Sequence, residues 1–214
     1  MSNYIKYPRT PHLPWSPGVS SDDVRNLNTA AFEGKQVVVT EKMDGENTSL
    51  YSDHIHARSL DSQHHPSRDW VKQWHASIAY SIPDNWRICG ENLYALHSVR
   101  YEQLASYFYG FSIWNDSNTC LSWQETQEWF ELLGIHSAPV LYQGIWDEKL
   151  ISSLSVDEDT MEGYVVRLAD AYAYKDFSQS IAKWVRPNHV QTDQHWMFAE
   201  LEANGLQEAT HETD

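Results

Sequence analysis

Residues 36–45 read Gln-Val-Val-Val-Thr-Glu-Lys-Met-Asp-Gly. The β-branched run at 36–40 predicts a strand, and the Asp44-Gly45 pair predicts a tight turn. Lys42 therefore stands at the end of an apolar strand, directly before the turn. A lysine beside an Asp-Gly hairpin turn is usually a solvated surface residue. The alternative is a nucleophile, since an amine that is desolvated or lies beside other cations has a lowered pKa and can attack an electrophile.

The segments on either side of residues 36–45 show both strand and helix patterns. Further strands are predicted at residues 48–51, 87–91, 140–145, 163–168 and 180–185. Helices are predicted at residues 21–34 and 67–80, from the capping box Ser122–Glu125 to Gly134, and near residues 193–203. Trp70 and Trp74 lie four residues apart on a predicted helix and are expected in the core rather than as a base-stacking platform. The order predicts an α+β fold of mainly antiparallel sheets flanked by helices.

The composition is that of a folded protein with an acidic surface. Of the 214 residues, 41% are hydrophobic, and 30 acidic against 15 basic residues give a net charge of -15. Such a surface repels polyanions unless its cations gather in one place. Nucleic-acid binding therefore requires a cleft that collects basic residues, for which the candidates are Lys42, Arg58, Arg167, Lys183 and Arg186, with Arg100 as a flanking contact.

Several classes of protein are excluded by what the sequence lacks. No apolar run approaches the ~20 residues of a membrane helix, and residues 1–9 lack the hydrophobic stretch of a signal peptide. Cys89 and Cys120 lie far apart without a CxxC or His/Cys pattern, which argues against a disulfide scaffold and a zinc site. We expect a cytoplasmic protein, in the host cytoplasm if it is viral, with no membrane partner.

Two later motifs matter only in combination with the first. Glu162-Gly163 precedes a predicted strand, and Lys183 ends another, and each alone is an ordinary surface pattern. Together with Lys42, Asp44-Gly45, Arg58, Gly90-Glu91 and Phe111, in this order, they resemble the covalent nucleotidyltransferase superfamily of ATP-dependent ligases and capping enzymes. Within it, residues 8–13, 89–95, 97–98, 107–113 and 183–196 resemble the RNA ligase 2-like family.

The resemblance implies a nucleotidyltransferase (ATP-grasp-like ligase) domain over residues 1–189 and a short C-terminal helical tail over 190–214. It implies that Lys42 takes AMP from ATP and that Lys183 neutralises the α-phosphate. A divalent ion, Mg²⁺ or Mn²⁺, is implied at Glu91 and Glu162. The nucleotide-binding set that it implies is Glu41 at the adenine edge, Asp44, Gly45, Arg58 on a phosphate, Glu91 at the ribose, Phe111 stacked on adenine, Glu162, Lys183 and Arg186.

The implied function is ATP-dependent ligation in RNA repair. It joins a 3′-hydroxyl to a 5′-phosphate RNA end through a lysyl-AMP intermediate and an adenylylated 5′ end, so RNA ends and ATP are the expected partners. Two positions depart from the family pattern: Ser112 replaces an acidic residue, and Val185 replaces a second basic residue, for which Arg186 is a substitute. The alternatives are a small DNA ligase, a capping guanylyltransferase, or a non-catalytic nucleotide- or RNA-binding module.

Overall fold

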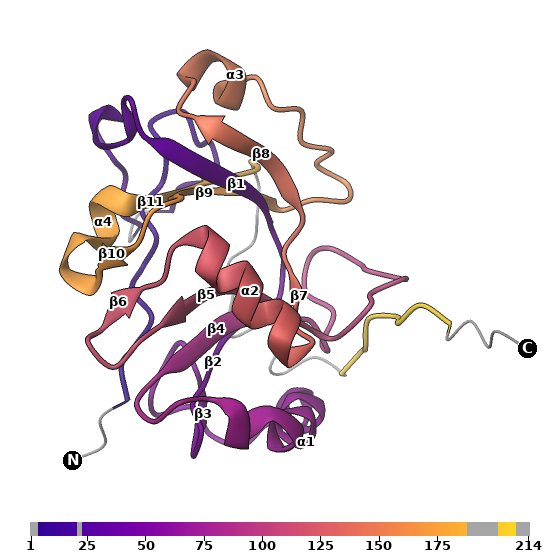
Figure 1. The fold of residues 1–214 in the computed structure, drawn as a ribbon. Helices are drawn as coiled ribbons and strands as arrows, with labels where there is room; N and C mark the ends of the chain where they lie inside the picture. The colour runs from indigo at the N-terminus through magenta and orange to yellow at the C-terminus, as the bar shows by residue number, and fades with distance from the viewer. Residues whose placement is uncertain (1–3, 21–22, 188–200, 209–214) are drawn as a thin grey trace, which may run out of the picture.

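The computed structural model describes residues 4–20, 23–187 and 201–208 and has two β-sheets. One sheet has four strands, in the order β11 (Ile181–Val185), β9 (Gly163–Leu168), β1 (Gln36–Lys42) and β8 (Val140–Ile145). The other has seven, in the order β10 (Tyr172–Ala173), β6 (Thr119–Cys120), β5 (Phe108–Trp114), β4 (Arg87–Asn92), β2 (Glu46–Leu50) and β3 (Ile55–Ala57), with β7 (His136–Ser137) paired to β5. All pairs except β5–β7 are antiparallel, which confirms the α+β fold of mainly antiparallel sheets (Figure 1).

Short helices flank the sheets. They are α1 (Asp69–Ile78), α2 (Trp123–Leu133), α3 (Glu148–Ser152) and α4 (Phe177–Ser180), with 3₁₀ turns η1 (Ala30–Phe32), η2 (Pro66–Arg68), η3 (Ala79–Ser81) and η4 (Tyr174–Asp176). The predicted capping box starts α2, because Ser122 Oγ accepts from the Glu125 N–H at 3.2 Å while Glu125 accepts from the Ser122 N–H at 3.0 Å. Gly134 ends α2 in the left-handed conformation.

The six strands predicted from sequence are all present, and one predicted helix is wrong. Residues 23–34 contain only the 3₁₀ turn η1, because the chain there pairs with the N-terminal segment instead. The His12 N–H donates to Val24 O at 2.7 Å, and the Asn26 N–H donates to His12 O at 2.8 Å. The predicted helix at 193–203 lies mostly outside the described residues, and residues 201–208 form isolated β-bridges rather than a helix.

The chain changes sheets at Asp44-Gly45. Strands β1 and β2 belong to different sheets and do not pair with each other, so this dipeptide is not a hairpin turn (Figure 1). Glycine is needed at position 45 because a Cβ there would lie 2.4 Å from the Asn92 carbonyl oxygen. Lys42 consequently stands at the junction of the two sheets rather than at a solvated surface turn.

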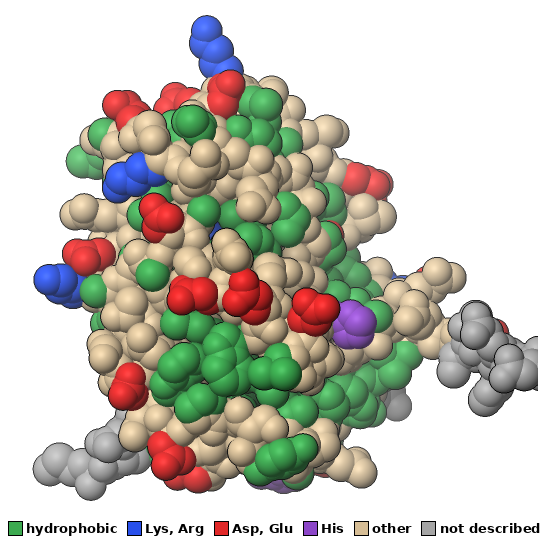
Figure 2. Space-filling view, viewed as in Figure 1, with side chains coloured by type: hydrophobic (Ala, Val, Ile, Leu, Met, Phe, Trp, Pro, Cys, Tyr) green, Lys and Arg blue, Asp and Glu red, His purple; other side chains and the backbone are tan. Residues whose placement is uncertain are grey.

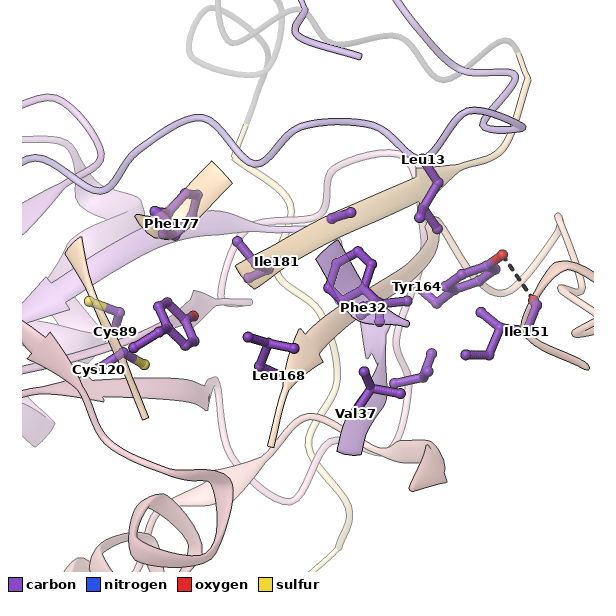
Figure 3. Packing of buried hydrophobic residues seen from close by; sticks show 14 of the residues in the cluster. Leu13, Phe32, Val37, Cys89, Cys120, Ile151, Tyr164, Leu168, Phe177 and Ile181 are labelled. Atoms are coloured by element: carbon purple, nitrogen blue, oxygen red, sulfur yellow. Dashed lines mark hydrogen bonds between the residues drawn. The ribbon is translucent and has the colours of Figure 1, made fainter. Parts of the chain in front are cut away.

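Two main cores hold the sheets in place. Val37, Val38 and Val39 are fully buried, which explains why the middle of β1 is an unbroken apolar run. The cluster that contains Val37 and Val39 also includes Leu13 and Phe32 from the N-terminal part of the chain (Figure 3). These long-range contacts tie the N-terminal segment to the first sheet.

A second cluster lies between the other sheet and α1 and α2. It includes Val71 of α1 and Phe130 of α2. Trp70 and Trp74 stack at a centroid distance of 5.7 Å and pack against it, which confirms their expected place in the core.

The acidic side chains are spread over the face that carries α2, where few lysines or arginines lie (Figure 2).

The described residues contain neither a disulfide bond nor a membrane-spanning helix. Cys89 and Cys120 are both buried free thiols in the first core (Figure 3). None of the helices in the described part of the chain is long and apolar enough to cross a membrane.

Candidate active site

A cleft of about 1410 Å³ lies where the two sheets meet. The first sheet contributes residues from β1, β9 and β11, and the second contributes residues from β2, β3, β4 and β5. All but one of the residues that sequence analysis assigns to the site line it: Glu41, Lys42, Asp44, Gly45, Arg58, Glu91, Phe111, Glu162 and Lys183. Arg186 is the exception. The fold thus brings together residues from six separate parts of the sequence.

Lys42 is paired with Glu162 across the first sheet. The strand register sets Lys42 opposite Gly163, so the residue that precedes β9 comes next to the lysine. Lys42 Nζ lies 2.5 Å from Glu162 Oε2, and the two side chains are 23% and 2% exposed. The cleft therefore holds a largely buried ion pair at the end of β1.

The electrostatics of Lys42 differ from the sequence expectation. Burial lowers the pKa of Lys42, but the carboxylates of Glu162, Glu91 and Asp44 together outweigh burial, so the pKa is raised. An amine in this state is a protonated partner of an ion pair rather than a free nucleophile. The expected lowering of the Lys42 pKa is wrong, because sequence reasoning counted the cations near Lys42 and not the carboxylates.

The lowered pKa belongs to Lys183 instead. Burial and the charge of Lys42 lower the pKa of Lys183 to about 8, against the opposing effect of Asp23 and Glu162. Asp23 Oδ1 lies 3.8 Å from Lys183 Nζ. Sequence analysis missed Asp23, since nothing in the pattern of residues 21–34 separates it from an ordinary helix-start residue. Two ammonium groups thus face the same volume, which suits a polyphosphate.

Glu91 and Glu162 form the candidate divalent-cation site. Burial and the nearby carboxylates of Glu162 and Asp44 raise the pKa of Glu91 to about 8, although Lys42 opposes them. No cluster of three or more potential metal ligands occurs within the described residues. Mg²⁺ needs no such cluster, because it usually takes one or two carboxylates and completes its shell with water and phosphate oxygens. The two carboxylates fit that donor set.

The crowding of carboxylates around Glu91 predicts a pH-dependent stability. A carboxyl with a folded-state pKa of about 8 and an ordinary value of 4.5 holds more protons when folded, so stability falls as pH rises between these values. We expect Glu91→Gln to raise the Tm at pH 8.5 by roughly 4–8 °C, the equivalent of about 2 kcal/mol, and to leave it unchanged at pH 4. Thermal unfolding of both proteins across this pH range checks it, and an equal gain at both pH values would contradict it.

Phe111 and Ser112 face opposite sides of β5. Phe111 is partly buried, lines the cleft and packs edge to face on Tyr7 at 5.4 Å. Ser112 is buried and accepts a hydrogen bond from Trp114 Nε1 at 3.1 Å. The departure from the family pattern at Ser112 therefore falls on the core side of the strand, away from the cleft.

Asp44 holds a neighbouring loop. Its Oδ2 accepts three hydrogen bonds, from the Ser98 N–H at 2.7 Å, the Ser98 hydroxyl at 2.8 Å and the Val99 N–H at 2.7 Å. Its own N–H donates to the Tyr101 hydroxyl at 2.9 Å. Ser98 was noted in sequence only as part of a family motif, and Val99 and Tyr101 carried no signal. This network builds one wall of the cleft.

The arginines divide into free and engaged groups. Arg58 lines the cleft and makes no hydrogen bond or ion pair to any residue that the structure describes. Arg167 is 3% exposed and donates to the carbonyls of Leu168 and Leu121, so its charge serves the core. Arg186 donates to Ser98 Oγ at 3.1 Å, beside the cleft. Arg58 is thus the arginine most available to an anion.

The charge balance of the cleft differs from that of the whole chain. Among the residues that the structure describes, seven lysines and arginines line the cleft together with eight aspartates and glutamates, whereas the whole chain has 15 basic and 30 acidic residues. Arg100 is not among the seven, although its ion-pair partner Glu202 lines the cleft. The expected gathering of cations is real, although carboxylates accompany them.

Solved structures of an RNA ligase from Naegleria gruberi are similar to this fold. The structure with PPi has a TM-score of 0.58 at 18% identity and covers 86% of this chain and 61% of its own. A glutamate-to-alanine variant with AMP and Mn gives 0.52 at 16%, covering 72% and 50%. A lysine-to-alanine variant with ATP and Mn gives 0.51 at 16%, covering 85% and 60%. At these identities the likeness concerns the fold, and this chain spans half to three-fifths of the length of those proteins.

Sequence comparison places the chain in a family. None of the curated proteins matches it. The pattern of the family described as RNA ligase matches residues 35–185, which is more than half of the 214 residues and runs from the start of β1 to the end of β11. The cleft and its paired lysine lie within the matched range. On this match, the chain belongs to the RNA ligase family.

Proposed function

We propose that the chain is an ATP-dependent RNA ligase that works through a covalent lysyl-AMP intermediate. The observation that carries the proposal is the position of Lys42, which ends β1 inside the cleft with Glu162 2.5 Å away. Lys183 and Glu91 approach the same volume from β11 and β4. A lysine in such surroundings has an acceptor for its proton, a second cation for the phosphate and a cleft large enough for a nucleotide.

In the first step Lys42 Nζ attacks the α-phosphorus of ATP. A P–N bond forms, the bond from that phosphorus to the bridging oxygen breaks, and pyrophosphate leaves. The amine has to be neutral to attack, and Glu162 Oε2 is placed to accept its proton. Lys183 supplies positive charge to the α-phosphate as charge shifts among its oxygens.

The other site residues fit the nucleotide. Phe111 lines the cleft and offers its ring to the adenine, and Glu41, half-buried at the end of β1, is placed for the adenine edge. Arg58, whose guanidinium pairs with none of the residues that the structure describes, offers it to a phosphate. Asp44 and Gly45 shape the backbone that follows Lys42, Asp44 through its hydrogen bonds and Gly45 through its close contact with Asn92. Arg186 is a candidate for binding the outer phosphates.

The two later steps follow the same chemistry. An oxygen of the RNA 5′-phosphate attacks the phosphorus of lysyl-AMP, the P–N bond breaks, and Lys42 is released with the 5′ end adenylylated. The 3′-hydroxyl of the second RNA end then attacks the 5′-phosphate phosphorus, a phosphodiester forms, and AMP leaves.

A divalent cation is part of the proposal. When bound, Mg²⁺ or Mn²⁺ offsets phosphate charge and aligns oxygens, and Glu91 and Glu162 would hold it. The structures of the Naegleria gruberi protein with ATP or AMP and Mn support the use of a divalent cation. The free thiols of Cys89 and Cys120 support action in a reducing compartment such as the cytoplasm.

The test separates the lysine-dependent steps from the last one. The native chain with ATP and Mg²⁺ is expected to join RNA strands that carry 5′-phosphate and 3′-hydroxyl ends. Lys42→Ala is expected to fail with ATP but to join RNA whose 5′ end is already adenylylated, because the last step needs no lysine nucleophile. Joining by Lys42→Ala with ATP would contradict the proposal. Joining of DNA ends alone would indicate a DNA ligase.

A further inference from the structure

The segment 201–208, here called the C-terminal clasp, docks on residues 93–107. The Gly205 N–H donates to Tyr101 O at 2.8 Å, and the Leu104 N–H donates to Gly205 O at 3.0 Å. Isolated β-bridges join Ala95 to Ala203 and Leu104 to Leu206. The clasp therefore pairs with residues 93–107 near both ends of that segment.

Asn204 is the centre of the clasp. It is 3% exposed, and its side chain is fully engaged with the segment beneath it. Asn204 Nδ2 donates to Leu93 O at 2.8 Å, while Asn204 Oδ1 accepts from the Tyr101 N–H at 3.0 Å. Gly205 follows with no room for a side chain, since a Cβ would lie 2.6 Å from Glu102 O. Such close approach fixes the clasp at one register.

Tyr101 links the clasp to the reactive lysine. Its backbone N–H and C=O both form hydrogen bonds with the clasp, and its hydroxyl accepts a hydrogen bond from the Asp44 N–H at 2.9 Å. The Asp44 carboxylate is bonded to Ser98 and Val99 of the same segment. Both the backbone and the side chain of Asp44, two residues after Lys42, are thus held by the segment that the clasp holds.

We propose that Asn204 and Tyr101 are positioning residues for the adenylylation of Lys42, and that the C-terminal clasp is part of the active site for this reason. The inference rests on the proposed function. A small displacement of a nucleophile costs much of the advantage of a fixed geometry. The clasp fixes the position of Asp44 through Tyr101, and Asp44 in turn fixes the backbone that directly follows Lys42.

The experiment measures the single-turnover rate of lysyl-AMP formation at saturating ATP, together with ATP affinity and Tm. Tyr101→Phe, which removes one hydroxyl, is expected to slow adenylylation by about tenfold with ATP affinity nearly unchanged. Asn204→Ala is expected to slow it to a similar degree. The double variant is expected to be no slower than the slower single variant, because both changes break the same link.

Tyr107→Phe is the matched control. It also removes a hydroxyl from this segment, one that donates to Asn204 O at 2.9 Å but does not reach Asp44. We expect its rate to stay within about twofold of the native rate, since Asn204 keeps its side-chain bonds. Equal slowing by Tyr101→Phe and Tyr107→Phe, or native rates in both Tyr101→Phe and Asn204→Ala, would overturn the inference. Failure of the native chain to form lysyl-AMP would instead overturn the proposed function.

Discussion

Lys183→Ala is expected to slow lysyl-AMP formation by about 10²- to 10³-fold at saturating ATP, the usual cost of removing one preorganised donor to a developing charge. Lys183 is positioned by β11, whose register sets it opposite Val165 of β9, and its amine faces the cleft beside Lys42. Its charge stands close to the reacting phosphate in the proposed first step. Rapid-quench sampling with intact-mass detection of the adduct measures the rate.

A matched variant separates charge from shape at this position. Lys183→Arg keeps the cation and is expected to retain more of the rate than Lys183→Ala. A small residue such as alanine also frees Asp23, which lies 3.8 Å from the amine, so Asp23→Asn serves as the control for that contact. A native rate in Lys183→Ala would show that this lysine has no part in the first step.

Glu162→Ala is expected to destabilise the fold strongly. It leaves the largely buried amine of Lys42 without its ion-pair partner, and breaking a buried pair by removing one member costs about 3–5 kcal/mol. For a chain of this size, the lower figure corresponds to a fall in Tm of roughly 6–12 °C. Thermal unfolding at pH 7 measures it.

The double variant tests whether the cost belongs to the pair. Lys42→Ala with Glu162→Ala removes both charges, so the combined loss is expected to be much smaller than the sum of the two single losses. Strictly additive losses would show that the two side chains do not stabilise each other.

The regular elements were predictable where local pattern and final environment agree. The valine run of β1 is fully buried in the middle of a sheet, and the Ser122–Glu125 capping box begins a helix as its chemistry requires. The helix predicted at residues 21–34 is wrong because Val24 and Asn26 hydrogen-bond to the backbone of His12, an interaction between separate segments that no local pattern reveals. The tight turn predicted at Asp44-Gly45 is not a hairpin for the same reason, because each flanking strand pairs with distant strands of a different sheet.

The site divides in a similar way. Resemblance to a family picked out nine residues that line one cleft, although they come from separate strands. It could not foresee the balance of charges on Lys42, because that depends on how closely Glu162 and Glu91 approach. Tyr101 and Asn204 were missed because a tyrosine and an asparagine in irregular segments carry no signal until the fold joins them.

The central claim is that Lys42 is the nucleophile, and intact-protein mass spectrometry tests it most directly. The native chain and Lys42→Ala are each incubated with magnesium and one nucleoside triphosphate at a time. The account predicts a gain of one AMP with ATP alone on the native chain and none on Lys42→Ala. A GMP adduct would indicate a capping enzyme. ATP binding without any adduct, or an AMP adduct that persists in Lys42→Ala, would contradict the account.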